Sequence, residues 1–489
     1  MRSVVLSTIV GSLLVAGAAH ATTYYVRAGG CDCADGKSDA TAWATLAKVN
    51  AASFATSDTV LFHEGDKWSG SLTVDWGGTA SSPAVVGAYY LKGGVPTRGY
   101  TTTRPTIDGA NTASGPYDGL LRVHASYVRV ENIKVINAKG RNIDVSDSTG
   151  SAVVGCSTDG AYGSGIHFAR AANPRAENNL VTHAGKAFKD GAAWGGAIEL
   201  DGVTGGIVKG NIVTEVYGEG INTNGGSRGS IIEGNHLYAV RAVGIYVDGS
   251  PDATVRRNIV VGSTNSEYWR SARSVGAGIA LNNESYHYKS QLQSTVQTQR
   301  AKVYGNLVAF ASAGIAVWGE YPLTSFDGTL IFNNTLVDNE SQVTVGTKPM
   351  PNSRFENNIL LTLSSGLRDV SGIELNGMSA KNNYFSQGDP GGNYTHSGNR
   401  FSGLELAKMS GWRSIGSREQ ITWRDFDVQE GSTVIGAGDD EPLRMATSGD
   451  TFQLDYNKYD HNAPMDMGGL RFGKVVVKQP AAPDNLALN

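Results

Sequence analysis

The chain has 489 residues, a formal net charge of −4 and 18% charged residues. This mild acidic balance includes no block of Lys and Arg, which argues against a nucleic acid partner. Glycine accounts for 63 residues, a share well above the ~7% of an average protein, and that excess predicts many tight turns.

The first 21 residues have the features of a secretory signal peptide. They begin with Met1-Arg2, continue with an apolar run over residues 4–17, and end in Ala19-His20-Ala21, a small-x-small cleavage site. We therefore expect cleavage after Ala21 and a secreted or periplasmic protein. No later run is long and apolar enough to predict a membrane span.

The segment after the predicted signal peptide has the pattern of a strand followed by a helix. Tyr24-Tyr25-Val26 predicts the strand, and the spacing of Trp43, Leu46 and Val49 predicts a helix with Thr41 as its N-cap. A repeat protein needs such a cap, because an open strand edge invites aggregation. Trp43 is therefore expected to be a core residue of the cap.

The three cysteines are Cys31, Cys33 and Cys156. An odd number cannot form a complete disulfide framework, although Cys31 and Cys33 can pair with each other in an oxidising compartment. Their scarcity and spacing do not favour a metal or catalytic role.

Three copies of one short pattern mark the centre of the chain. Asn211-Ile212-Val213, Asn235-His236-Leu237 and Asn258-Ile259-Val260 begin 24 and 23 residues apart (235 − 211 and 258 − 235). Gly220-Ile221 and Gly244-Ile245 lie between them, also 24 apart (244 − 220), so each period contains two predicted strands. Periods of this length are typical of solenoids, and Asn side chains one turn apart can form a hydrogen-bonded ladder.

The same pattern extends the solenoid in both directions, and it recurs at Asn179, Asn306, Asn334, Asn358 and Asn383. A period near 24 predicts roughly ten turns within residues 22–400. The step of 48 from Asn258 to Asn306 (306 − 258) predicts one turn with two insertions, residues 262–275 and 283–301. The repeat fades after residue 400, so residues 401–489 are expected to form an irregular C-terminal cap and tail.

Aligning the second strand of each period places polar side chains in two outward columns, because side chains alternate along a strand. One column holds His167, Glu199, Asn222 and Tyr246, and the other holds Asp201, Asn224, Asp248, Asn282 and Trp318. Carboxylates, amides, His and Tyr gather over four adjacent turns, and the first column then continues as Ala280 and Ala316. This localisation favours a functional site over a uniformly polar wall.

These repeats resemble the right-handed parallel β-helix of the pectate lyase and polygalacturonase superfamily. The resemblance implies an all-β solenoid with an N-terminal capping helix. Glu199-Leu200-Asp201, followed by Asn222-Thr223-Asn224, is similar to the frame of chondroitinase B and related alginate lyases. In those lyases an acid-x-acid pair binds calcium, which implies a calcium site at Glu199 and Asp201 if this chain is a lyase.

The leading hypothesis is an enzyme that hydrolyses glycosidic bonds in a polysaccharide, with Asp201 and Asp248 as acid and base. Two turns of ~4.8 Å separate them by about 9 to 10 Å, near the ~6.5 to 9.5 Å that inverting hydrolases use. That reaction requires no cofactor. Further catalytic candidates are Glu199, Arg241, His167 and Tyr217.

Two alternatives remain open. One is a lyase that cleaves a uronate polymer by β-elimination, with Lys186, Arg241, His167 or Tyr217 as base or acid. The other is a non-catalytic protein that binds a glycan or assists polysaccharide export. For either enzyme we expect a monomer whose substrate-binding residues are Asn222, Asn224, Tyr246, Lys186, Tyr268, Trp269, Arg270, Tyr286 and His287.

Overall fold

The computed structural model describes residues 21–468, apart from 111–114, 116, 272–273, 285–295, 321–324, 373, 392–394, 407–417, 427, 440 and 448–466. The predicted signal peptide, except Ala21, lies outside the described residues. So do Tyr286 and His287, and so does most of the predicted tail.

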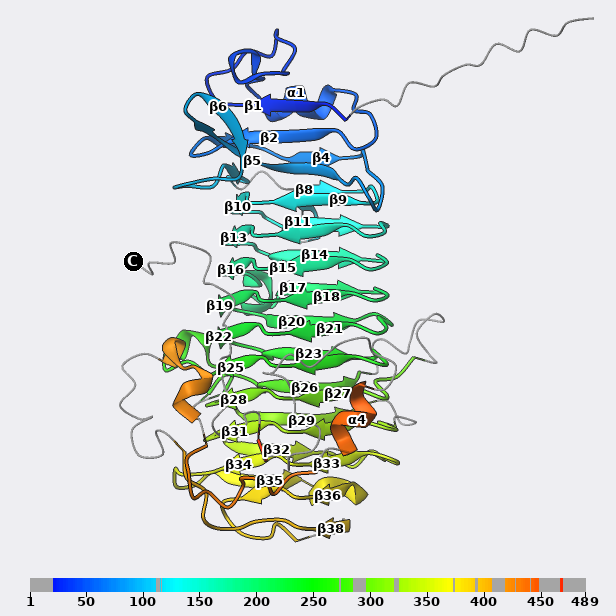
Figure 1. Ribbon diagram of the computed structural model, residues 1–489, viewed down its shortest axis with the longest axis vertical. Helices are drawn as coiled ribbons and strands as arrows, with labels where there is room; N and C mark the ends of the chain where they lie inside the picture. Colours follow the sequence, from blue (N-terminus) through cyan, green and yellow to red (C-terminus); the bar gives the residue numbers. More distant parts are fainter. Residues whose placement is uncertain are drawn as a thin grey trace, which may run out of the picture.

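The chain is a right-handed parallel β-helix with three long sheets, here named A, B and C (Figure 1). Sheet A contains, in spatial order, β1 (Thr23–Val26), β2 (Thr59–His63), β5 (Ala84–Lys92), β9 (Val128–Glu131), β12 (Ala152–Val154), β15 (Arg175–Glu177), β18 (Ile207–Lys209), β21 (Ile231–Glu233), β24 (Thr254–Arg256), β27 (Lys302–Tyr304), β30 (Leu330–Phe332), β33 (Arg354–Glu356), β36 (Ser379–Lys381) and β38 (Thr395–Ser397). An additional strand, β6 (Val95–Arg98), pairs antiparallel with β5.

Sheets B and C complete each turn. Sheet B contains β3 (Lys67–Ser69), β7 (Thr106–Asp108), β10 (Lys134–Ile136), β13 (Ser157–Asp159), β16 (Leu180–Thr182), β19 (Ile212–Val216), β22 (His236–Val240), β25 (Ile259–Val261), β28 (Leu307–Ala309), β31 (Thr335–Val337), β34 (Ile359–Leu361) and β37 (Tyr384–Phe385). Sheet C contains β4 (Leu72–Val74), β8 (Gly119–Val123), β11 (Arg141–Ser146), β14 (Ile166–Ala169), β17 (Gly196–Asp201), β20 (Glu219–Asn224), β23 (Ile245–Asp248), β26 (Ile279–Asn283), β29 (Ala313–Gly319), β32 (Ser341–Val345) and β35 (Arg368–Gly372).

Each regular turn therefore has three strands, not the two that the sequence predicts. The missed strands belong to sheet A and are only three residues long in this region, as in β21, which is too short to produce a visible alternation. In the described part of the chain sheet B has 12 strands and sheet C has 11, so the solenoid is slightly longer than the predicted ten turns. The additional turns lie at its irregular N-terminal end.

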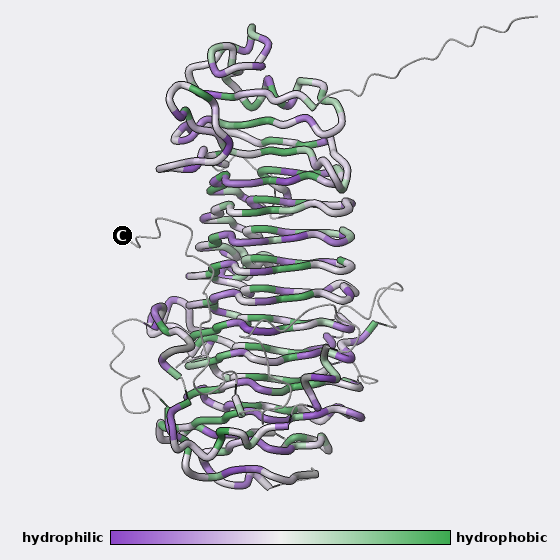
Figure 2. The backbone as a smooth tube through the Cα atoms, viewed as in Figure 1, coloured by the Kyte–Doolittle hydropathy of each residue, from purple (hydrophilic) through white to green (hydrophobic). Residues whose placement is uncertain are grey.

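The core is a set of apolar stacks inside the solenoid. Ile198 of β17 pairs with Ile221, which pairs with Ile245 and then Ile279, and all four side chains are fully buried. This is the register that the aligned Gly-Ile segments predict. Apolar and polar residues alternate along the strands (Figure 2), as expected when one face of each strand points inward.

The predicted Asn ladder is present. Nδ2 of Asn211 donates to Oδ1 of Asn235 at 2.9 Å, and Nδ2 of Asn235 donates to Oδ1 of Asn258 at 3.0 Å. The backbone N–H of each Asn donates to the same oxygen of the next Asn. Gly210 and Gly234, which precede two of them, have φ of 66° and 64°, so the left-handed corner position falls just before the ladder residue.

The N-terminal cap differs from the prediction in its helix boundary. The helix α1 (Leu46–Ala51) has Thr45 as its N-cap, whose side chain accepts from the N–H of Lys48. Thr41 instead ends a short 3₁₀ turn, and the chain between them is extended at Ala42. Trp43 is a core residue of the cap as predicted, since it is 4% exposed and stacks on Tyr24.

The cysteines are divided between a pair and a single buried residue. Cys31 and Cys33 form a disulfide in the N-terminal cap. Cys156 is free and buried in the solenoid core, where burial raises the pKa of its thiol to about 11. Such a thiol is inert at neutral pH.

The C-terminal region folds back along the solenoid and covers parts of two sheets. Leu404, Ile421, Phe426 and Val434 belong to an apolar cluster with residues on the outer face of sheet B. The helix α4 (Glu441–Thr447) lies beside sheet A (Figure 1), where Lys302 Nζ donates to the carbonyl of Ala446 at 2.7 Å. No helix in the described part of the chain has the length and apolar character that crossing a membrane requires.

Candidate functional site

Sheet C carries a continuous row of polar side chains on its outer face. Arg122, Asp144, His167, Glu199, Asn222 and Tyr246 occupy paired positions on β8, β11, β14, β17, β20 and β23. The parallel column runs through Asp201, Asn224, Asp248, Asn282 and Trp318. The predicted columns are thus correct. We call the outer surface of β11 to β20 that carries Asp144, His167, Glu199, Asp201, Glu219 and Asn222 the carboxylate face.

Glu219 is the most perturbed carboxyl group of this face. It begins β20 and pairs with Gly196 of β17. The side chain is buried, and Asn222 Nδ2 donates a hydrogen bond to its Oε2. Burial raises the pKa of Glu219 to about 8, and the charge of Glu199 adds to this effect. The carboxyl group is therefore mainly protonated at neutral pH.

The sequence contained a signal for Glu219 that the column alignment passed over. Position 219 directly precedes Gly220-Ile221. The equivalent positions in neighbouring turns hold Ser164, Gly196, Val243 and Ala277. A carboxylate at a position that otherwise holds small or apolar residues is a candidate functional group. Residue 219 was passed over because the aligned segments begin one residue later, at Gly220.

Glu199 and Asp201 lie on β17, beside Glu219. Ser164 Oγ donates to Oε2 of Glu199 at 2.6 Å, and both carboxylates are partly exposed. Oδ1 of Asn222 and of Asn224 accepts no hydrogen bond from the described residues. These acceptors are left for water or for a ligand hydroxyl group.

Asp248 is placed differently from its predicted catalytic partner Asp201. Its side chain is fully buried, and its Oδ1 accepts from the backbone N–H of Glu284 at 2.9 Å. Glu284 belongs to the second predicted insertion, which extends directly from β26. A fully buried carboxylate that receives a backbone hydrogen bond is better placed to hold that insertion than to reach a polymer.

His167 belongs to a buried polar group at the N-terminal side of the face. Its Nδ1 lies 2.7 Å from Oδ1 of Asp144, and Arg141 Nη1 lies 3.2 Å from the same oxygen. Burial alone would raise the pKa of Asp144, but the contacts with His167 and Arg141 hold it below its usual value. His167 is 2% exposed, and its contact with the Asp144 carboxylate orients the imidazole ring.

Tyr246 closes the C-terminal side of the face. Its hydroxyl group donates to Oε1 of Glu284 and receives a hydrogen bond from Asn282 Nδ2, both at 2.5 Å. Its ring stacks on Trp318 with centroids 6.0 Å apart. Burial and nearby carboxylates raise its pKa, so the hydroxyl group stays protonated.

Tyr217 and Arg241 lie at the corner between sheets B and C, under the first insertion. Tyr217 donates to Oε1 of Glu267 at 3.0 Å, and Arg241 Nη1 donates to the carbonyls of Glu267, at 3.1 Å, and of Trp269. Lys189 binds Glu267 at 2.9 Å. These contacts fix the segment 262–270 to the solenoid, which favours a positioning role for Tyr217 and Arg241.

The predicted sugar-binding aromatic residues of the first insertion face inward. Tyr268 is 3% exposed and stacks on Tyr217 at 5.3 Å. Trp269 packs against the solenoid core and donates from Nε1 to the carbonyl of Ser263. Tyr268 in particular has no exposed ring face to offer a sugar, because burial of its apolar ring stabilises the insertion. Lys186 is partly exposed in α2 (Lys186–Lys189), and Arg270 is exposed.

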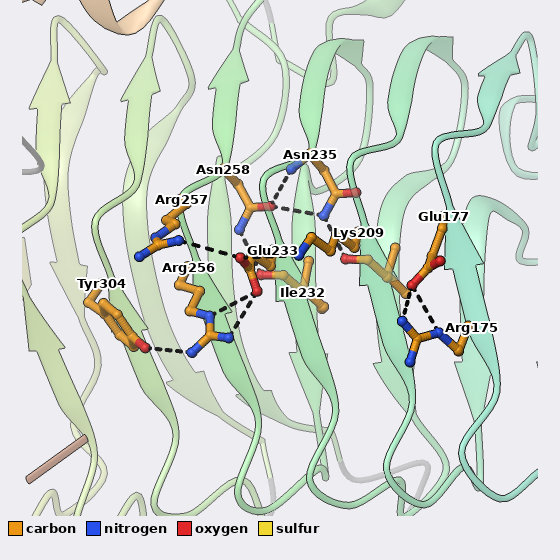
Figure 3. Close-up of polar contacts among 11 residues, drawn as sticks. Arg175, Glu177, Lys209, Ile232, Glu233, Asn235, Arg256, Arg257, Asn258 and Tyr304 are labelled. Carbon is orange, nitrogen blue, oxygen red and sulfur yellow. Dashed lines mark hydrogen bonds and ion pairs between the residues drawn. The ribbon is translucent and has the colours of Figure 1, made fainter. Parts of the chain in front are cut away.

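The charges on sheet A contrast with those on the carboxylate face. There Glu233 contacts Arg256 at 2.9 Å and Arg257 at 3.6 Å, and Arg175 Nε donates to Glu177 at 2.9 Å (Figure 3). These carboxylates are neutralised by neighbouring cations and are structural. The salt bridges in the described part of the chain do not include Glu199, Asp201 or Glu219.

No group of three or more His, Cys, Asp or Glu side chains in the described residues is arranged to hold a metal ion. The calcium site at Glu199 and Asp201 that the lyase resemblance implies stays a prediction.

One family model matches part of the chain. It is described as periplasmic copper-binding protein (NosD), and the match covers residues 89–283. No curated protein matches the chain.

Several solved structures share the fold at low sequence identity. Pectate lyase Pel9A is 14% identical, with a TM-score of 0.52 over 93% of this chain and 97% of that one. An alginate lyase from Paenibacillus sp. is 15% identical, with a TM-score of 0.45 over 73% and 97%. A GH136 lacto-N-biosidase from Eubacterium ramulus is 14% identical, with a TM-score of 0.42 over 78% and 68%. The similarity to Pel9A establishes the β-helix fold.

Proposed function

We propose that the protein is an exported carbohydrate-active enzyme that cleaves glycosidic bonds of a polysaccharide on the carboxylate face. The observation that carries the proposal is the pairing of Glu219, whose pKa is raised to about 8, with the partly exposed carboxylate of Glu199. Glycoside hydrolysis requires one carboxyl group that is protonated and acts as acid, and a second that is ionised and acts as base or nucleophile. Different environments give the two groups different pKa values. The polymer-cleaving activity named for Pel9A, whose fold this chain shares, is in keeping with the proposal.

In the proposed reaction Glu219 is the general acid and donates its proton to the oxygen of the leaving sugar. Glu199, or Asp201 on the same strand, takes a proton from the attacking water, whose oxygen forms the new bond to the anomeric carbon. Asn222 holds the Glu219 carboxyl group and orients it. Glu219 thereby replaces Asp248 as the proposed acid, since Asp248 accepts the backbone N–H of Glu284, whereas the pKa of Glu219 is raised to about 8.

The runner-up is a lyase, and the Asp144–His167 pair favours it. A histidine that a carboxylate orients at 2.7 Å is a suitable base for removing the proton next to a uronate carboxyl group. Arg122 and Arg141 flank the pair and could neutralise that carboxyl group. Hydrolysis is preferred because Glu219 and Glu199 form an acid and base pair in which Glu199 is partly exposed, whereas Nδ1 of His167 is taken up by Asp144.

Copper binding, which the matched family model names, is not supported by the donor set. A copper site needs several imidazole, thiolate or thioether ligands directed at one point. Cys156 is buried in the core, and His167 is occupied by Asp144. No described cluster of His, Cys, Asp and Glu has a suitable arrangement, so the described residues do not fit a copper ion.

A panel of neutral and uronate-containing polysaccharides tests the proposal. The purified protein should release new reducing ends from at least one polymer, with no rise in ultraviolet absorbance. A rise in absorbance would identify the unsaturated product of elimination and support the lyase. Binding without new reducing ends from any bound polymer would indicate a non-catalytic glycan-binding protein. A parallel series with a chelator reports whether calcium contributes.

A further inference from the structure

Two aromatic side chains beside the carboxylate face are unusually exposed. Trp194 is 58% exposed and Tyr117 is 57% exposed, the highest values among the large aromatic residues that the structure describes. Aromatic rings carry a large apolar area, and a folded chain normally buries most of it. Rings that stay in water are candidates for contact with a ligand.

Both rings lie on the same edge of sheet C. Tyr117 precedes β8 by two residues, and Trp194 precedes β17 by two residues. Along sheet C the intervening strands are β11 and β14, so the two positions are three rungs apart. With ~4.8 Å per rung, they are separated by about 14 Å along the solenoid axis. That length accommodates several linked sugar rings.

One arginine lies beside Tyr117, and a second lies beside the ring that packs against Trp194. Cζ of Arg141 lies 5.5 Å from the ring centroid of Tyr117. Trp194 packs against Phe188 with centroids 4.8 Å apart, and Cζ of Arg270 lies 5.8 Å from the Phe188 ring. An apolar ring face next to a guanidinium group suits a sugar that presents C–H groups on one face and a carboxylate at its rim.

These contacts connect to the proposed catalytic groups. Arg141 also contacts Asp144, which pairs with His167, the neighbour of Glu199 on sheet C. Trp194 lies five residues before Glu199 and leads directly into the same strand, β17. The two aromatic positions and the carboxylate face thus form one track parallel to the solenoid axis.

We propose that Trp194 and Tyr117 are sugar-stacking subsites for an acidic polysaccharide, which binds along the solenoid axis with its uronate carboxylates near Arg270 and Arg141. This inference rests on the proposed function and specifies its substrate class. A polymer that lies along the axis extends past the carboxylate face, which fits cleavage within the chain.

The test measures binding rather than cleavage, in the Glu219→Gln background. The probe is polygalacturonate, and its methyl ester serves as the matched uncharged polymer. Trp194→Ala and Tyr117→Ala should each weaken polygalacturonate binding about three- to tenfold, the scale of one aromatic stacking contact. Trp194→Tyr should restore most of the affinity. Arg270→Gln should weaken binding of polygalacturonate but not of its methyl ester.

Phe401→Ala is the control, because Phe401 is 42% exposed but stacks on Phe385 near the C-terminal end of the solenoid. It should bind as tightly as the background protein.

Equal affinity of the Trp194→Ala, Tyr117→Ala and background proteins would overturn the inference while leaving the proposed function intact. Failure to bind any polygalacturonate would also overturn it, and cleavage of a neutral polymer would then still support the proposed function. Binding that depends on both rings, without cleavage by the wild-type protein, would uphold the subsites and reject the proposed function.

Discussion

Nδ1 of His167 lies 2.7 Å from Oδ1 of Asp144, and the two residues occupy neighbouring rungs of sheet C. The side chains are 3% and 11% exposed. Each buried group offsets the cost of burying the other, so removal of either one leaves its partner buried without a partner. The pair therefore stabilises the solenoid and also holds two neighbouring strands of the carboxylate face together.

Asp144→Ala should lower the free energy of unfolding by about 1 to 3 kcal/mol at neutral pH, because His167 and Arg141 lose a buried acceptor. The low pKa of Asp144 means that its contribution is present above pH ~4 and is lost as the pH falls below that value. Urea denaturation at pH 7 and pH 3 should show a larger difference between variant and wild type at pH 7 than at pH 3. Equal midpoints at pH 7 would contradict this account.

Asn235→Ala should interrupt the Asn ladder. The change removes the acceptor for the Asn211 N–H and the donor to Asn258, in a site that is 1% exposed. Each buried group left unpaired costs about 1 to 3 kcal/mol. Asn352→Gly is the control, since Asn352 is exposed, bonds only one Asp327 oxygen in the described contacts, and has a φ of 54° that glycine adopts without strain. Thermal unfolding should show a clear loss for Asn235→Ala and almost none for the control.

Arg241→Met should release the first insertion without dismantling the solenoid. Among the described contacts, the Arg241 side chain donates hydrogen bonds only to the carbonyls of Glu267 and Trp269. Hydrogen exchange over residues 262–270 should accelerate, while the melting temperature changes little. If Arg241 instead acts as a catalytic group, turnover at saturating substrate would fall by orders of magnitude with exchange unchanged.

Glu219 should make the protein less stable as the pH rises from about 4.5 to about 8. Its pKa in the folded protein is raised to about 8, so the folded state binds a proton that the unfolded chain has released above its normal value near 4.3. The favourable contribution is complete below that value and is lost as the pH approaches 8. Glu219→Gln should remove this part of the pH dependence. Parallel melting curves for both proteins across this range would contradict the raised pKa.

The regular part of the fold could be predicted because identical residues recur at a fixed interval. Asn211, Asn235 and Asn258 identify the turns, and the Gly-Ile segments set the register of sheet C. The third strand of each turn was not predicted, since three-residue strands such as β24 are too short to show a period. The N-cap was misplaced because Thr41 and Thr45 are both acceptable caps by residue type, and the structure uses Thr45.

The candidate site was predicted in outline but not in its electrostatics. The columns through Glu199 and Asp201 follow from strand alternation alone. Burial of a particular carboxyl group depends on its neighbours in three dimensions. Asp248 accepts the backbone N–H of Glu284, and Glu219 accepts a hydrogen bond from Asn222 at the start of β20. Neither fact can be read from spacing.

The most direct test of the proposed catalytic apparatus is the pH profile of kcat for the wild-type protein and Glu219→Gln on a cleaved polysaccharide. The wild-type rate should fall as the pH rises through about 8, because Glu219 must be protonated to act as the acid. Glu219→Gln should lower kcat by roughly two orders of magnitude or more while its circular dichroism spectrum stays unchanged. Near-normal kcat in Glu219→Gln, with the alkaline limb preserved, would contradict the assignment of Glu219.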